Sequence, residues 1–145
     1  MTYLNDLLGN RAVFLPILSW ITAQVFKFVL YAITKRTVDF RKLVTSGGMP
    51  SSHSAITVCL AAVMAMDYGF GSAAFAMATI FSLVVMADAT GVRRAAGKQA
   101  EVLNKLVNHT GVIRLDKELK ELLGHTPVQV FAGAVLGIAI AAVFR

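Results

Sequence analysis

The sequence contains very little cysteine and few charged side chains. Cys59 is the single cysteine and lies inside an apolar run, which excludes a disulfide framework and a CxxC metal site. Only 15% of the 145 residues are charged and 57% are hydrophobic, a composition that departs from soluble proteins toward membrane proteins. The formal charge of +6 comes without a nucleic-acid-binding motif, so we expect no nucleic-acid partner. The length predicts a single domain, residues 1–145.

Four apolar runs dominate the chain, at residues 12–33, 54–66, 72–87 and 128–144. The first is long enough to cross a hydrocarbon core, because a helix rises about 1.5 Å per residue. The second and third are shorter, and the turn-like segment between them predicts a helical hairpin. We therefore expect an all-α fold, an integral membrane helical bundle with about four membrane helices plus short interfacial helices.

The segment between the third and fourth runs predicts the interfacial helices. Apolar residues recur at helical spacing over residues 92–107, opposite a charged face, which is typical of an amphipathic helix at a membrane surface. A shorter helix is predicted at residues 116–123. In the last run, Gly133 and Gly137 are four residues apart and have two interpretations: close packing within one chain, or, together with Ala73 and Ala74, a homodimer.

Basic residues are concentrated in two connections, one after the first apolar run and one after the third. Together these connections hold most of the 14 lysines and arginines of the chain. The positive-inside rule therefore predicts that both connections face the cytoplasm and that the chain lies in the cell (inner) membrane with its termini outside.

Three polar stretches, at residues 47–54, 88–94 and 124–130, belong to this expected cytoplasmic face. In the first, a diglycine and a proline precede Ser51, Ser52 and His53 at a helix start, where unpaired N–H groups and the helix dipole attract a phosphate. His53 is placed to give a proton to a departing alkoxide. The alternative interpretation is that a serine only caps the helix and that His53 has no chemical role.

His125 precedes the last apolar run, where Thr126 and Pro127 predict a helix start. An imidazole can attack phosphorus directly and form a phosphohistidine, so His125 and His53 suffice as nucleophile and acid. Gln129 has two interpretations: it closes a capping box with Thr126, or it orients the His125 ring.

Basic residues are the candidates for binding the charge of the phosphate. A lysine near the centre of a spanning helix costs about 2.5 to 3.5 kcal/mol, so Lys27 either faces a polar interior or extends its ammonium to the interface. Arginine forks match phosphate oxygens, but the same residues can fix topology or bind anionic lipid; the candidates are Arg41, Arg93 and Arg94. Asp88 has three open roles: to orient a histidine, to pair with Arg93, or to pair with Lys27.

Two ordered elements resemble those of the superfamily of type 2 phosphatidic acid phosphatases and vanadium haloperoxidases. The superfamily's Pro-Ser-Gly-His element is similar to residues 50–53, and its Gly-His-x-x-x-Asp-Val-x-x-Gly element is similar to residues 124–133. The Gly-Gly-Met-Pro-Ser-Ser-His-Ser run at residues 47–54 and the Asp-Ala-x-Gly-Val-Arg-Arg run at residues 88–94 resemble the divergent bacterial and plant membrane branch. The resemblance covers most of the chain.

The resemblance implies that His125 is the nucleophile, that His53 is the general acid, and that Ser51 and nearby amides cradle the phosphate. It also implies that no metal and no cofactor are required. Ser52 stands in place of the cradle glycine and keeps its backbone N–H. Gln129 stands in place of the aspartate that would hold the nucleophile's ring, and it adds no charge to stabilise an imidazolium.

The basic residues depart further from the superfamily pattern. Leu119 occupies the position of an arginine that the pattern places six residues before the nucleophile. We therefore expect Arg93 or Arg94 to take over that role, with Lys27 and Arg41 as the earlier basic groups.

The expected function is a membrane lipid-phosphate phosphatase that acts through a phosphohistidine on a phosphomonoester or diphosphate. The candidate substrates are phosphatidylglycerophosphate, phosphatidate and polyprenyl phosphates, because a site at helix ends meets headgroups while the lipid tail stays in the bilayer. The bilayer and a phosphorylated lipid are then the partners. The alternative is a non-catalytic membrane protein that binds anionic lipid or a membrane partner, and Gln129 is the feature that favours it.

Overall fold

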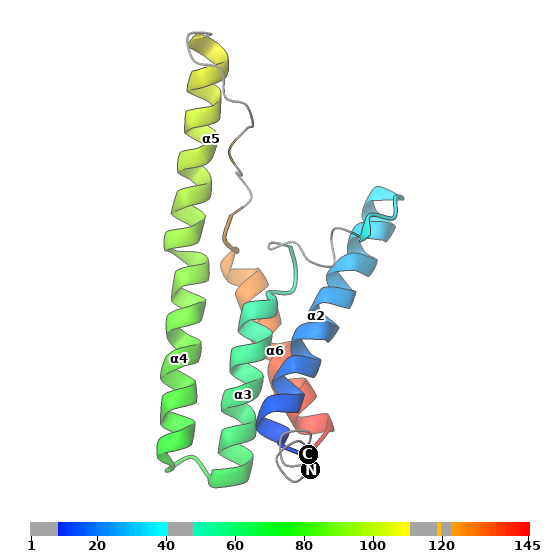
Figure 1. Ribbon diagram of the computed structural model, residues 1–145, viewed down its shortest axis with the longest axis vertical. Coiled ribbons are helices and arrows are strands. Elements are labelled where there is room, and N and C mark those ends of the chain that lie inside the picture. Colours follow the sequence, from blue (N-terminus) through cyan, green and yellow to red (C-terminus); the bar gives the residue numbers. More distant parts are fainter. Residues whose placement is uncertain (1–8, 41–47, 111–118, 120–122) are drawn as a thin grey trace, which may run out of the picture.

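The computed structural model describes residues 9–40, 48–110, 119 and 123–145 of the chain. The elements in these ranges are α-helices (Figure 1): α2 (Arg11–Lys35), α3 (Ser52–Tyr68), α4 (Ala73–Thr90), α5 (Val92–Thr110) and α6 (Pro127–Val143). Each of the four predicted apolar runs forms a helix whose ends lie within three residues of the prediction, and the amphipathic segment forms α5. The helix predicted at residues 116–123 lies outside the described residues, apart from Leu119 and Leu123.

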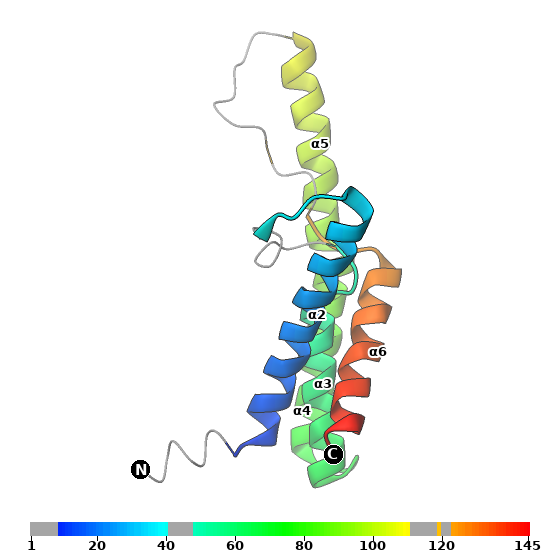
Figure 2. The same cartoon turned by 90° about the vertical axis from the view of Figure 1, so that its right-hand side faces the viewer.

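Helix α3 lies at the centre of the bundle and packs against α2, α4 and α6. Figures 1 and 2 show that α2 and α4 run in one direction and that α3 and α6 run in the other. The C-terminal ends of α2 and α4 and the N-terminal ends of α3 and α6 therefore meet at the same end of the bundle. This arrangement brings all three predicted polar stretches to one end.

Glycines allow α6 to approach α3 closely. A Cβ atom on Gly137 would lie 2.5 Å from the carbonyl oxygen of Ala55 and 2.8 Å from the amide nitrogen of Cys59, and one on Gly133 would collide with the carbonyl oxygen of Ser51. The two glycines thus serve packing within the chain, in the manner of small-residue contacts between membrane helices. The homodimer stays a prediction.

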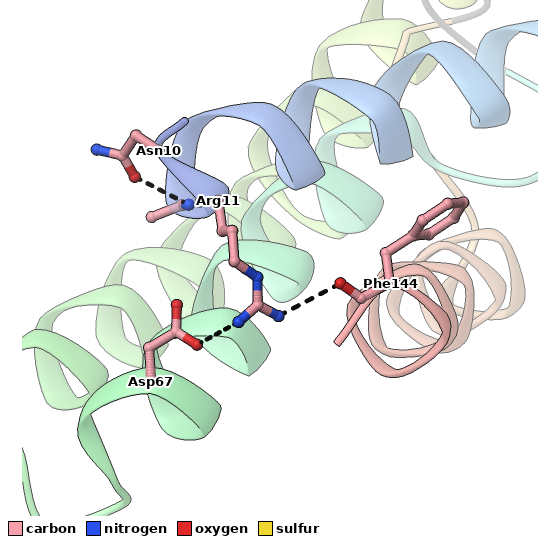
Figure 3. A network of polar contacts seen from close by, with 5 residues as sticks. Asn10, Arg11, Asp67 and Phe144 are labelled. Carbon is pink, nitrogen blue, oxygen red and sulfur yellow. Dashed lines mark hydrogen bonds and ion pairs between the residues drawn. The ribbon is translucent and has the colours of Figure 1, made fainter. Parts of the chain in front are cut away.

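The opposite end of the bundle is tied together by Arg11 (Figure 3). Its guanidinium donates to the Asp67 carboxylate at 2.8 Å and to the Phe144 carbonyl at 3.4 Å, which joins the start of α2 to the ends of α3 and α6. Because the Arg11 side chain is 40% exposed, this ion pair stabilises the fold by no more than about 1 kcal/mol.

Two helical stretches are long and apolar enough to cross a membrane: α2, and the stretch Ala73–His109 that begins with α4. Helix α6 is a shorter apolar helix. Large apolar side chains on these helices point outward, among them Phe14, Phe81 and Phe131, which are 55%, 55% and 71% exposed. Exposed apolar surface of this kind is suited to contact with lipid.

Helix α5 extends the line of α4 beyond the other helices (Figure 1), whereas the sequence predicted a helix lying along the membrane surface. Helical hydrogen bonds continue across the junction, from the Gly91 N–H to the Ala87 carbonyl at 2.8 Å and from the Ala95 N–H to the Gly91 carbonyl at 2.9 Å. These bonds keep the two helices in line. Among the described helices, α5 packs only against α4.

Candidate active site

Two histidines from distant parts of the chain face each other at the end where the polar stretches meet. His53 lies in the first turn of α3, and His125 lies two residues before α6. Their ring centroids are 6.3 Å apart, and the ring planes are inclined by 56°. At this separation both rings can contact one tetrahedral group that lies beside them.

The backbone around His125 is fixed by the junction of α4 and α5. The His125 N–H donates to the Ala89 carbonyl at 2.9 Å, and the residue is only 5% exposed. Gly124 has a φ of +82°, and a Cβ atom there would lie 2.5 Å from the Arg94 amide nitrogen. Both the positive φ and the close approach require glycine at position 124.

The Gln129 side chain satisfies both interpretations drawn from the sequence. Its Oε1 accepts the Thr126 N–H at 3.0 Å, which closes the capping box, and it lies 3.2 Å from Nδ1 of His125. Because a backbone N–H donates to this atom, it is the amide oxygen, and His125 Nδ1 must carry the proton that it shares with it. The lone pair of the neutral ring is then on Nε2.

Burial lowers the pKa of His125 below its usual value, and the positive charges of Lys27 and Arg93 and the His53 ring lower it further. The hydrogen bond to Gln129 opposes this shift. The net direction favours the neutral imidazole, which is the form that can act as a nucleophile.

A pocket opens beside the two rings, at the junction of α4 and α5. It is lined by His53, Val85, Asp88, Ala89, Arg93, Leu123, Gly124 and His125. Within it, Nε of Arg93 donates to the Asp88 carboxylate at 2.6 Å, so Asp88 pairs with Arg93 among the three roles left open. Arg94 is exposed and does not line the pocket, although its backbone packs on Gly124.

Lys27 reaches the same end of the bundle from within α2. Its ammonium donates to Gln24 Oε1 at 2.9 Å and to Ser52 Oγ at 3.0 Å, and the residue is 7% exposed. Lys27 therefore faces the polar interior and does not extend to the interface. Ser52, in the first turn of α3, lies next to His53 in the chain.

Ser51 is fully buried and joins α3 to α6. Its N–H donates to the Gln129 carbonyl at 2.9 Å, and its hydroxyl accepts the Ser54 N–H at 3.4 Å as the cap of α3. Both groups are engaged within the protein, so the geometry of Ser51 is that of a helix cap. Arg41, the remaining candidate, lies outside the described residues.

Three polar residues near the site received no role from the sequence. Gln24 bonds Lys27, and Ser82 of α4 donates to Thr57 Oγ1 at 3.1 Å. Thr57 in turn donates to the His53 carbonyl at 2.9 Å, so this chain of hydrogen bonds supports the turn that carries His53. Polar side chains inside apolar runs were the signal that sequence reasoning could have used.

In the described part of the chain, no group of three or more His, Cys, Asp or Glu residues is placed to hold a metal ion.

These features define the class: an α-helical membrane protein with a polar, histidine-containing site where helix ends converge. The chain belongs to the Divergent PAP2 family, which matches it over residues 8–140. This confirms the resemblance drawn from the sequence. The PAP2-related proteins include phosphatases.

A relative in Bacillus subtilis (strain 168), the uncharacterized membrane protein YuiD, is 40% identical over 148 residues, covering 93% of this chain and 94% of YuiD. No solved structure matches the chain.

Proposed function

We propose that the protein is a membrane lipid-phosphate phosphatase that hydrolyses a phosphomonoester or diphosphate through a phosphohistidine. The observation that carries this proposal is the pair of imidazoles of His53 and His125, 6.3 Å apart beside a pocket that also contains Arg93. Membership of the Divergent PAP2 family supports the same class of reaction.

In the first half of the reaction, Nε2 of His125 attacks phosphorus and forms the N–P bond. The P–O bond to the lipid breaks, and the departing alkoxide takes a proton from the His53 imidazolium. Gln129 holds the Nδ1 proton of His125 in place, so that Nε2 carries the attacking lone pair.

In the second half, a water molecule attacks the phosphohistidine. His53, now neutral, accepts a proton from this water while the N–P bond breaks and the lone pair returns to His125. Inorganic phosphate leaves, and both histidines regain their starting protonation states. The cycle needs a general acid that becomes a general base, and one imidazole can serve as both.

Positive charge is required because negative charge accumulates on the phosphoryl oxygens. Arg93 lines the pocket, and Lys27 is joined to the first turn of α3 through Ser52. Both are cations close enough to influence the pKa of His125. Their side chains, together with the first-turn amides of α3, form the phosphate site of this proposal.

The lipid substrate and the cytoplasmic orientation are also part of the proposal. If α2, α3, α4 and α6 all cross the bilayer, the site lies at the level of the headgroups, on the side of the basic connections. A lipid phosphate then reaches the histidines while its tail stays in the hydrocarbon. Phosphatidylglycerophosphate, phosphatidate and polyprenyl phosphates are the candidates.

The test is phosphate release by the purified chain in detergent from a panel of these lipid phosphates, with and without chelator. We expect release from at least one lipid, unaffected by chelator and abolished in His125→Ala, with phosphate trapped on His125 in the wild type. No release from any lipid would favour the second candidate, and release that stops with chelator would contradict a metal-independent reaction.

The second candidate is a non-catalytic protein that binds an anionic lipid or a membrane partner at the same site. Gln129 favours it, since an amide in place of a carboxylate stabilises a cationic imidazole less. Such a protein would bind lipid phosphate equally well in the wild type and in His125→Ala.

A further inference from the structure

Among the residues that the structure describes, Lys27 is a buried cation without a buried anion beside it. Its ammonium donates hydrogen bonds to two neutral oxygens, one on Gln24 and one on Ser52. These two residues are 7% and 3% exposed. In the described part of the chain, no carboxylate lies within ion-pair distance of Lys27. Burying a charge without an ion-pair partner is costly, so this arrangement lowers the stability of the bundle.

The choice of acceptor at position 24 determines how much of the Lys27 charge is left for a ligand. An amide oxygen fixes the ammonium by a hydrogen bond but leaves its full positive charge. A carboxylate at the same place would fix it equally well and cancel that charge. An ammonium has three donors, and within the described part of the chain Gln24 and Ser52 occupy two of them, which leaves one N–H for a phosphoryl oxygen.

From this geometry we infer that Gln24 is a positioning residue of the phosphate site, which holds Lys27 beside the first turn of α3 while keeping its charge available to the substrate. The inference rests on the proposed function. Gln24 acts through Lys27 and does not itself touch the substrate. The position three residues before Lys27 puts both side chains on one face of α2, as this contact requires.

The sharpest test is Gln24→Glu, because glutamate has nearly the shape of glutamine and can accept the same hydrogen bond. If Gln24 had only a structural role, the variant would be at least as stable as the wild type and bind phosphate unchanged. We expect stability to be kept and the affinity for orthovanadate to fall by about tenfold or more, with a matching rise in KM and a smaller change in kcat. Vanadium NMR on the full chain in detergent measures this affinity without turnover.

Two further variants make the test specific. Gln99→Glu makes the same substitution at an exposed position of α5 and should leave vanadate affinity unchanged. Lys27→Met removes the ammonium that Gln24 holds, and adding the uncharged substitution Gln24→Met to it should cause no further loss, because the side chain at position 24 would have no ammonium left to position. An equal loss in the Lys27→Met background would overturn the positioning role.

Gln24→Met removes the acceptor without adding charge and should give an affinity between those of the wild type and Gln24→Glu. Unchanged vanadate affinity in both Gln24 variants would overturn the inference, while phosphate release by the wild type would leave the proposed function standing. Conversely, a wild type that binds vanadate but hydrolyses no lipid phosphate would overturn the proposed function and leave the role of Gln24 to be decided by binding. A wild type that does neither would overturn both.

Discussion

The Oε1 atom of Gln129 lies 3.2 Å from Nδ1 of His125 and also accepts the N–H of Thr126. One amide oxygen therefore closes the cap of α6 and orients the histidine that precedes it. The bond that orients the ring and the bond that closes the cap share this acceptor atom, so loss of the Gln129 side chain removes both. A carboxylate would fit this position equally well, because capping boxes accept glutamate or glutamine.

Gln129→Glu should therefore increase activity. The carboxylate keeps the cap and stabilises the cationic imidazole that forms when Nε2 binds phosphorus. Stabilising the cationic imidazole of His125 by the equivalent of one pKa unit lowers its free energy by about 1.4 kcal/mol. We therefore expect roughly a tenfold rise in the rate of phosphohistidine formation. Single-turnover measurements of phosphate trapped on His125 would test this. A rate equal to or below that of the wild type would show that charge at position 129 does not limit the reaction.

The rate of the wild type should depend on pH through His125. Burial, followed by neighbouring positive groups, lowers the pKa of His125, and only its neutral form is a nucleophile. Because the proposed reaction also needs the His53 imidazolium, kcat/KM should pass through a maximum and fall at high pH as His53 loses its proton. The decline on the low-pH side, which reports protonation of His125, should lie below the ordinary histidine value of about 6.5. In Gln129→Glu the added negative charge should move this decline to higher pH. A low-pH decline in the wild type with its midpoint above the ordinary value would contradict the direction of the His125 shift.

Arg93 and Arg94 should differ sharply in their effect on substrate binding. Both side chains are exposed, but Arg93 lines the pocket and pairs with Asp88, whereas Arg94 does not line it. Loss of a charge-assisted hydrogen bond costs about 1.5 to 3 kcal/mol, so Arg93→Ala should raise KM by roughly tenfold or more. Arg94→Ala should stay within about twofold of the wild type. Equal effects of the two substitutions would mean that both arginines act only through their general charge.

Gly137→Ala should destabilise the bundle by about 1 to 3 kcal/mol, the usual range for overpacking. Its new Cβ atom would lie 2.5 Å from a backbone oxygen of α3, and backbone cannot move as a side chain can. Gly71→Ala is the matched control, because a Cβ atom there meets nothing within 4 Å. Thermal unfolding in detergent measures the difference. If both variants unfold at the wild-type temperature, the close contact of α3 and α6 is wrong.

Local patterns in the sequence sufficed for the helices and for some of the site. The apolar runs defined four helices because chain segments rich in apolar side chains must be helical in a membrane. Thr126 with Gln129 indicated a capping box, as one of two interpretations, from residue types and spacing alone. The histidines could be selected because their chemistry is uncommon in such a chain.

Other assignments required the packing of the helices. Arg93 and Arg94 are equivalent in sequence, but adjacent residues point about 100° apart around a helix, so the rotation of α5 determines which one lines the pocket. The sequence allowed the Lys27 side chain to point inward or toward the interface, and only its contact with Ser52 distinguishes the two. Gln24, which bonds Lys27, therefore received no role from the sequence. Backbone hydrogen bonds across Gly91 keep α5 in line with α4, and the amphipathic spacing of the side chains carries no information about these bonds.

By itself, the sequence determined a membrane protein of apolar helices with His53, His125 and several cations near the ends of apolar runs, because composition, periodicity and capping residues act over a few neighbouring positions. Only the tertiary structure decided that His53 and His125 face each other, that Asp88 engages Arg93, and that Ser51 is a buried cap. Those outcomes depend on how far each helix is rotated and how closely α6 approaches α3. Backbone-to-backbone packing at Gly133 and Gly137 sets the second of these.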